Sequence, residues 1–255
     1  MDVLLTNDDG IRATGLRTLY AALLEAGHTV HVVAPIRQQS GVGHSLTVFE
    51  PVRAVDIVEP HFRGTGVYGT PTDCVKLALS TLLTRQPDMV ISGINAGQNV
   101  GPDILYSGTV GAATEAAHEN LPSIAVSHND HRASVDLLPQ ARHLVSLASR
   151  VDWACLAPRR VVNVNYPAGT LDQAKGVVVC PQTNAVWKNV YTERFDPRGA
   201  PYWWLEGEIP AESVNPGSDK DMLNRGYITI TPLHFEFTDH DGMEVLRGMA
   251  GLTAP

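Results

Sequence analysis

The amino-acid sequence predicts an α/β fold built on a doubly wound, mostly parallel sheet. Two observations lead to this prediction. Short apolar runs alternate along residues 1–180 with segments whose leucines and alanines recur at helical spacing, which is typical of parallel sheets covered by helices. Several apolar runs also end abruptly in polar loops that contain glycine. Because open α/β sheets bind ligands at the carboxyl ends of their strands, these loops are candidate functional segments.

The first apolar run begins at Val3 and stops at Asn7-Asp8-Asp9-Gly10. Such a run, ending in turn-forming residues, reads as a buried strand, and Gly10 permits a sharp exit from it. Adjacent carboxylates repel each other, and the repulsion is relieved when one pKa rises or a hard cation binds. The same four residue types also favour plain turns, so this stretch alone leaves a metal site and a turn as alternatives.

The next elements repeat the pattern. Apolar residues at helical spacing over 16–24 predict a helix, which Gly27 ends as a C-terminal cap. Residues 29–34 predict a second strand, and the polar, glycine-bearing loop 35–45 leaves its carboxyl end.

A second helix is predicted over 70–83, with a well-specified start. Thr70 can cap it, Pro71 suits its first turn, and Asp73 lies near the positive end of the helix dipole. Residues 88–92 then predict a third strand, which runs into a loop rich in glycine and asparagine.

The remaining elements complete the predicted core. An alanine-rich helix, a strand, a further helix and a further strand are predicted in turn. Their ranges are 107–120, 123–127, 137–148 and 160–165.

The whole chain is predicted to form a single domain, residues 1–255, with a core over 1–180. Residues 181–225 read as a projecting hairpin, because aromatic residues lie on both sides of the turn Asp196-Pro197-Arg198-Gly199. Exposed aromatic residues on a hairpin favour a subunit interface over a ligand site.

Residues 226–255 are predicted to return to the core. They contain a late strand over 227–231 and a short terminal helix over 243–249.

The charge composition limits the kinds of ligand and partner that the protein can bind. The formal net charge is -8, and the 19 lysines and arginines are scattered, which argues against a nucleic-acid partner. If the ligand is a phosphate, an acidic protein must supply positive character from a metal and from backbone N–H groups at helix starts.

The cysteines and the amino terminus indicate a compartment. Cys74, Cys155 and Cys180 are odd in number and lack paired spacing, so neither a disulfide framework nor a zinc site is expected, and all three should be buried, reduced thiols. No basic leader precedes an apolar region, and no apolar run reaches about 18 residues. We therefore expect a soluble, cytoplasmic protein that does not contact a membrane.

Three predicted strand ends bring oxygen ligands to one edge of the sheet: Asp8 and Asp9, then Ser40, then Asn95. A hard divalent cation, Mg²⁺ or Mn²⁺, takes carboxylate, hydroxyl and amide oxygens. The pattern predicts one metal ion at this edge, and Asp8 is expected to lie closest to the chemistry.

A helix start supplies the matching anion site. Ser107-Gly108-Thr109 opens the alanine-rich helix, where free N–H groups and hydroxyls suit a phosphate oxygen. Ordinary N-capping by Ser107 is the alternative. A metal beside an anion pocket implies phosphoryl chemistry, specifically hydrolysis of a phosphomonoester.

Two other signals are weighed against this hypothesis. Gly64-Thr65-Gly66-Val67-Tyr68-Gly69 matches a dinucleotide-binding pattern, but the preceding residues 60–63 do not read as an apolar strand, so NAD binding is disfavoured. His44, and His128 with His131, lie in loops at the active edge and could contact substrate or act as an acid, although loop histidines are commonly bystanders.

An ordered series of motifs resembles the SurE (survival protein E) family of 5'-nucleotidases. The motifs stand in family order and spacing: Asn7-Asp8-Asp9-Gly10, Ala34-Pro35 with Ser40-Gly41, Gly69-Thr70-Pro71 with Asp73-Cys74-Val75, Ser92-Gly93-Ile94-Asn95 with Gly97 and Asn99, and Tyr106 through Ala113. Later segments that also match are 163–167, 196–199 and 226–233.

The resemblance implies a Rossmann-like fold and a divalent-metal-dependent phosphatase. Its substrates would be nucleoside 5'-monophosphates, with 3'-monophosphates and short polyphosphate as further possibilities. Carried over, the catalytic and metal-binding residues are Asp8 and Asp9, with Ser40 and Asn95 completing the metal ligands; Asn95, Asn99, Ser107, Gly108 and Thr109 would bind substrate phosphate. His44 is a further candidate for substrate contact.

The resemblance also implies homo-oligomers. Dimers of the family exchange carboxyl-terminal elements, and a hairpin can build tetramers. A nucleotide-binding or sensing protein without turnover is the alternative function.

Overall fold

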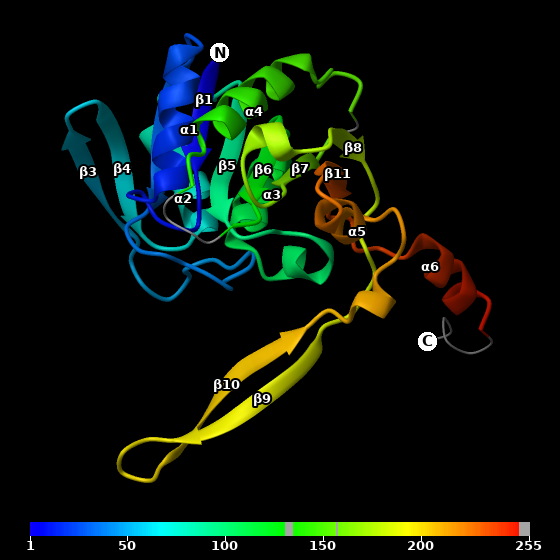
Figure 1. Ribbon diagram of the computed structural model, residues 1–255. Coiled ribbons are helices and arrows are strands. Elements are labelled where there is room, and N and C mark those ends of the chain that lie inside the picture. The colour runs from blue at the N-terminus through cyan, green and yellow to red at the C-terminus, as the bar shows by residue number, and fades with distance from the viewer. Residues whose placement is uncertain (131–134, 157, 250–255) are drawn as a thin grey trace.

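The computed structural model describes residues 1–130, 135–156 and 158–249. Over these residues the chain forms a nine-stranded sheet in the order β3-β4-β2-β1-β5-β6-β7-β11-β8, and a separate two-stranded hairpin of β9 and β10 (Figure 1). The predicted fold class, a mostly parallel α/β sheet with a projecting hairpin, is confirmed.

Five parallel strands form the centre of the sheet. In spatial order they are β2 (Thr29–Pro35), β1 (Asp2–Thr6), β5 (Met89–Ala96), β6 (Ser123–His128) and β7 (Arg160–Tyr166). Side chains of β1 alternate between two cores, since Val3 and Leu5 pack on one face of the sheet and Leu4 on the other. Burial on both faces explains the continuous apolar sequence of this strand.

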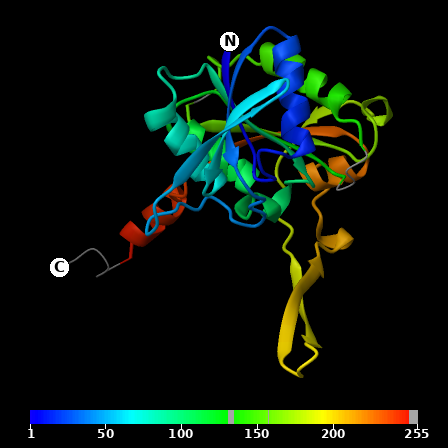
Figure 2. The same ribbon diagram turned by 90° about the vertical axis from the view of Figure 1, so that its left-hand side faces the viewer.

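Helices cover both faces. α1 (Thr14–Glu25) packs beside α4 (Leu138–Arg150) on one face, and α2 (Pro71–Leu77) packs beside α3 (Gly108–His118) on the other, as Figures 1 and 2 show. α2 continues as the π-helical turn η1 (Ala78–Leu82).

The predicted helix boundaries have identifiable causes. Thr70 and Asp73 form a reciprocal capping box at the start of α2. Gly27, with φ of +79°, follows α1 in the left-handed conformation that glycine adopts most easily. Both features agree with the prediction.

Several strands differ from the prediction. β3 (Arg53–Glu59) and β4 (Phe62–Tyr68) form an antiparallel pair at one edge, and β8 (Val177–Val179) lies at the other. β3 and β4 were not predicted because charged residues and glycines interrupt their apolar positions, and β8 was not predicted because it has only three residues. β5 also extends to Ala96, so Asn95 lies at the end of a strand and not in the predicted loop.

The glycine pattern at Gly64 lies inside a strand, because β4 begins at Phe62; residues 60–63, which do not read as an apolar strand, therefore include the first two residues of β4. A Cβ on Gly64 would lie 2.8 Å from Val32 Cβ, and one on Gly66 would lie 2.2 Å from Ile36 Cδ1. These glycines therefore permit close packing in the strand, and the geometry of a dinucleotide-binding turn is not present there.

The cysteine expectation needs one correction. Cys74 and Cys180 are buried free thiols, whereas Cys155 is exposed and its Sγ donates to Asp152. Cys155 lies in a surface turn that follows α4, so the prediction that all three thiols are buried is wrong for this residue.

The carboxyl-terminal part extends away from the core. β9 (Lys188–Phe195) and β10 (Pro201–Glu208) project from the body in both views, and α6 (His240–Arg247) follows β11 (Ile228–His234), with α5 (Asp219–Asn224) at the hairpin base (Figures 1 and 2). No residue of α6 is buried. Within the described part of the chain, no helix is long and apolar enough to cross a membrane.

Candidate active site

The turn after β1 presents Asp8 and Asp9 at the carboxyl edge of the sheet. Asn7 shapes this turn, because its amide donates to Gly10 O at 3.0 Å and its Oδ1 accepts the Gly10 N–H at 3.1 Å. Gly10 has a φ of +100°, which a side chain would strain. The turn interpretation of Asn7-Asp8-Asp9-Gly10 is therefore correct, and the same turn aims two carboxylates at the site.

Asp8 is held against the start of α3. The Thr109 hydroxyl donates to Asp8 Oδ1 at 2.5 Å, and a Cβ on Gly108 would lie 2.8 Å from Asp8 Cβ. Burial raises the pKa of Asp8 to about 6; the charge of Asp9 adds to the rise, and the Thr109 hydrogen bond opposes it. A cation bound beside Asp8 would therefore stabilise the ionised form of this carboxylate.

Asp9 is joined to two neighbouring segments. Its Oδ2 accepts the Ala96 N–H at 2.9 Å, and its Oδ1 accepts from Gln38 Nε2 at 3.3 Å. Gln38 Nε2 also donates to Ser40 Oγ at 3.0 Å. The Gln38 amide therefore bridges Asp9 and Ser40, a role that the sequence reasoning missed.

Asn95 reaches the same edge from the end of β5. Its Nδ2 donates to Gly97 O at 2.8 Å. Because the nitrogen and oxygen of an amide point in different directions, this bond leaves Oδ1 oriented away from Gly97 and suited to a ligand.

A cavity of about 240 Å³ lies beside this group. It is lined by Asp9, Gln38 and Asn95, by the start of α1 at Ala13, Thr14 and Gly15, and by Ile94, Ala96, His128, Asp130, Val135 and Leu137. The cavity has room for a small molecule bound beside Asp9 and Asn95.

The α3 start is an ordinary N-cap as well as a candidate anion site. Ser107 Oγ accepts the Val110 N–H at 3.1 Å, as the capping alternative predicted. The first backbone N–H groups of a helix have no intrahelical partner. Those of Gly108 and Thr109 lie at the helix end that contacts Asp8.

Asn99 and His128 lie deeper than expected. Asn99 Nδ2 donates to Ser127 Oγ at 2.8 Å, and Asn99 N donates to Asn165 Oδ1 at 2.8 Å, so Asn99 fixes the loop after β5. His128 is 1% exposed and its Nε2 lies 3.1 Å from Gly169 O. His131 lies outside the described residues.

His44 is engaged by a residue that the sequence did not single out. His44 Nε2 lies 2.8 Å from Glu115 Oε2, and Lys76 Nζ donates to Glu115 Oε1 at 2.6 Å. The His44 hydrogen bond, with the charge of Lys76, lowers the pKa of Glu115 to about 2. The available signal was a carboxylate within an alanine-rich helix. We call Glu115, His44 and Lys76 the Glu115 cluster.

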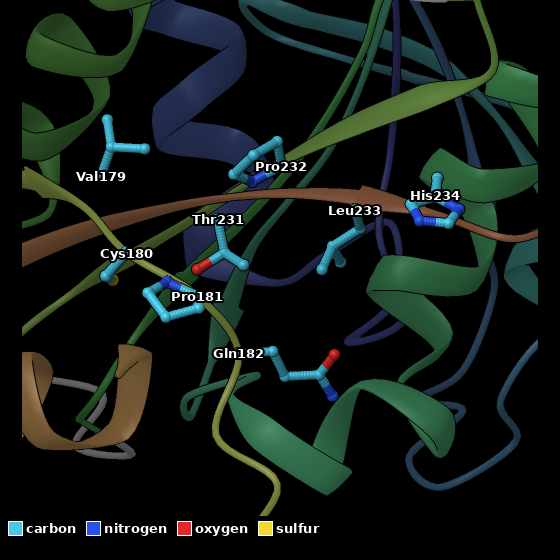
Figure 3. Close-up of a pocket in the computed structure, with 8 residues that line it drawn as sticks. All are labelled: Val179, Cys180, Pro181, Gln182, Thr231, Pro232, Leu233 and His234. Carbon is cyan, nitrogen blue, oxygen red and sulfur yellow. The ribbon is translucent and has the colours of Figure 1, made fainter. Parts of the chain in front are cut away.

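A second, larger groove of about 520 Å³ lies elsewhere, between β11 and the segment that follows β8 (Figure 3). Its lining is mainly apolar and none of its described residues is acidic: Val179, Cys180, Pro181, Gln182, Thr231, Pro232, Leu233 and His234. It contains none of the predicted site residues.

The donor set fits a hard divalent cation. Among residues 1–130, 135–156 and 158–249, no three His, Cys, Asp or Glu side chains are grouped so that they could hold a metal ion by themselves. Two adjacent carboxylates, one of them with a raised pKa, beside hydroxyl and amide oxygens match the ligands of Mg²⁺ or Mn²⁺.

The fold and the site together define an α/β protein with an oxygen-rich, acidic site at the carboxyl edge of a parallel sheet. A family model described as Survival protein SurE matches residues 3–189. The chain therefore belongs to the SurE family, which confirms the resemblance seen in its motifs.

Known proteins agree with this assignment. A Desulfovibrio desulfuricans protein named 5'-nucleotidase SurE is 72% identical over 253 residues, covering 98% of each chain. A protein of the same name from Lawsonia intracellularis is 41% identical, covering 93% of this chain and 94% of that one. The crystal structure of the SurE protein from Aquifex aeolicus matches with a TM-score of 0.82 at 36% identity, covering 97% of this chain and 98% of that one.

The Glu115 cluster should stabilise the fold in a pH-dependent way. A carboxylate whose pKa is lowered from 4.5 to about 2 on folding contributes stability above pH 4.5, and this contribution is lost as pH falls toward 2. We expect Glu115→Gln to reduce the free energy of unfolding by roughly 2 kcal/mol at pH 7. This figure is smaller than the full pKa shift would give, because Lys76 is half-exposed and water screens its interaction with Glu115.

Urea denaturation from pH 3 to pH 7 measures this difference. The gap between wild type and Glu115→Gln should narrow as pH falls. A gap that stays constant over this range would contradict the ion-paired state of Glu115.

Proposed function

We propose that this protein is a divalent-metal-dependent phosphomonoesterase that hydrolyses nucleoside 5'-monophosphates to nucleoside and phosphate. The observation that carries the proposal is the contact between Asp8, the neighbour of Asp9, and the start of α3, where Thr109 donates to Asp8. Relatives named 5'-nucleotidase SurE support the substrate class. Nucleoside 3'-monophosphates and short polyphosphate are proposed as further substrates.

The residues that would hold one Mg²⁺ or Mn²⁺ per subunit are Asp8, Asp9, Ser40 and Asn95. When bound, the cation supplies Lewis-acid polarisation of the phosphoryl oxygens. The protein prepares its ligands in advance: Thr109 orients Asp8, and Gln38 joins Asp9 to Ser40. Preorganised groups of this kind lower the cost of rearrangement during the reaction.

The substrate phosphate would bind at the start of α3. The N–H groups of Gly108 and of Thr109, the latter shared with the Asp8 carboxylate, and the hydroxyl of Ser107 would provide donors, and the positive end of the helix dipole favours an anion. Asn95 would contact both metal and phosphate, and Asn99 would support this loop from behind. Burial of Asp8 limits water around its carboxylate, which strengthens its interactions.

Phosphate release tests the proposal. Purified protein is assayed with 5'- and 3'-nucleoside monophosphates and short polyphosphate, with Mn²⁺, with Mg²⁺ and with EDTA. We expect metal-dependent release that falls at least about 100-fold in Asp8→Asn, because one ligand charge is removed at nearly constant shape.

Asp172→Asn is the matched control, because Asp172 is exposed and is not among the residues that line the cavity beside Asp9 and Asn95. Its release rate should equal that of wild type. Nucleotide binding in equilibrium dialysis without phosphate release would favour the alternative, a nucleotide-binding or sensing protein.

We also propose that the protein is a cytoplasmic homo-oligomer that binds neither nucleic acid nor membranes. The net charge of -8 supports the absence of a nucleic-acid partner. The hairpin supports self-association, because one of its faces carries Tyr191, Phe195, Trp203 and Leu205, which are 54–65% exposed. α6 adds exposed Val245 and Leu246.

A charge on the apolar hairpin face should lower the molecular mass in solution. We expect Trp203→Lys to shift the mass measured by light scattering from a dimer or tetramer toward a smaller species, because a charge is buried there on assembly. Ser149→Lys, at an exposed position of α4 outside the hairpin, is the control and should keep the wild-type mass. Equal masses for both variants would exclude this face as the interface.

A further inference from the structure

Glu115 is a buried carboxylate outside the proposed metal site, and it joins three segments of the chain. Its side chain is 8% exposed. It lies two turns along α3 from Thr109, and it binds Lys76 of α2 and His44 of the loop that follows β2. A carboxylate buried with two cationic or hydrogen-bonding partners is a strong local constraint.

The loop that contains His44 also contains Gln38 and Ser40. Both of these residues are exposed, so their mutual hydrogen bond competes with water and cannot fix the loop by itself. Gly41 and Gly43 lie between Ser40 and His44 with φ of +76° and +58°. Because glycine can adopt many backbone conformations, contacts with the rest of the protein are needed to keep this part of the loop in one of them.

The loop meets α3 closely at His44. A Cβ on Gly111 would lie 2.7 Å from Gly43 O and 3.0 Å from His44 Cα, so the helix and loop backbones touch. Gly43 N donates to Tyr106 O at 2.9 Å, just before the start of α3. The loop therefore runs along the helix whose start faces Asp8.

Beyond His44 the chain is tied to α2. Asp73 accepts the Thr47 N–H at 3.0 Å and the Thr47 hydroxyl at 2.5 Å, and Thr70 Oγ1 donates to Ser45 O at 2.8 Å. These bonds hold the far end of the loop. At the near end, Gln39 N donates to Asp8 O at 2.7 Å and Gln38 Nε2 donates to Asp9 Oδ1. The pair of His44 and Glu115 is the side-chain contact that joins the middle of the loop to α3.

We propose that Glu115 is a positioning residue for the metal site: by holding His44 it fixes the loop on α3 and so places Ser40 and Gln38 beside Asp9. This inference rests on the proposed metal-dependent function, and it gives His44 a different role from substrate contact. His44 lies four residues from Ser40 in the sequence, so the pair acts through the loop backbone. In this role neither Glu115 nor His44 contacts the metal or the substrate.

A double-mutant cycle between His44 and Ser40 tests the inference. Mn²⁺ affinity is measured by titration calorimetry, without substrate, for wild type, His44→Ala, Ser40→Ala and the double variant. We expect His44→Ala to weaken Mn²⁺ binding about 10-fold, as loss of supporting contacts around metal ligands does. In the Ser40→Ala background the same change should weaken binding less than about 2-fold, because its target is already absent.

Conservative variants separate positioning from general destabilisation. His44→Gln keeps an N–H donor for Glu115 and should recover most of the Mn²⁺ affinity, whereas Glu115→Gln removes the charge at constant shape and should weaken binding in the same way as His44→Ala. Arg142→Ala removes an exposed ion pair between Arg142 of α4 and Glu25 of α1. These two helices cover the face of the sheet opposite to α3, so this variant should leave Mn²⁺ affinity unchanged.

Three outcomes would overturn the inference. An equal loss from His44→Ala in both backgrounds would show that His44 does not act through Ser40. Unchanged Mn²⁺ affinity with a raised KM for nucleotide would make His44 a substrate contact. Absence of Mn²⁺ binding by wild type would refute the metal-dependent function itself, which separates that failure from failure of the positioning role.

Discussion

The arrangement of the site depends on one electrostatic constraint: two adjacent carboxylates at the end of a buried strand. Asp8 is 6% exposed and its pKa is raised to about 6, so its ionised form is unfavourable when no cation is bound beside it. The surroundings reduce that cost from several directions. Thr109 donates to Asp8, Ala96 N and Gln38 donate to Asp9, and the start of α3 contributes the positive end of its dipole.

Close backbone approach is what lets these groups converge. Gly10 turns the chain out of β1, Gly108 brings the start of α3 against Asp8, and Gly111 admits the loop from β2 onto the same helix. A side chain at either helix position would meet neighbouring atoms at 2.7–2.8 Å. The small residues of the Ser107-to-Ala113 segment therefore serve the geometry of the site as well as helix packing.

The sequence predicted the parts of this arrangement that follow from local chemistry. The apolar run of β1, the capping box of α2 and the start of α3 are specified by neighbouring residues, and each was located within a residue or two. The ordered motifs added the family. β3 and β4 escaped detection because an edge hairpin with exposed charged residues lacks a continuous apolar pattern.

The supporting residues could not be predicted in the same way. Gln38 and Glu115 matter through partners that are 29 and 71 residues away in the chain, so their roles appear only in the folded protein. Asn99 was assigned to substrate through the family resemblance, and the tertiary structure joins it to Ser127 and Asn165. The aromatic hairpin, by contrast, was evident from the sequence because aromatic residues lie on both sides of the turn at residues 196–199.

The most direct test of the account is the anomalous scattering of Mn²⁺ in crystals of the protein grown with this ion. The account predicts one Mn²⁺ per subunit, bound by oxygens from Asp8, Asp9, Ser40 and Asn95. A Mn²⁺ peak bound elsewhere in the chain, with none at this edge of the sheet, would contradict it.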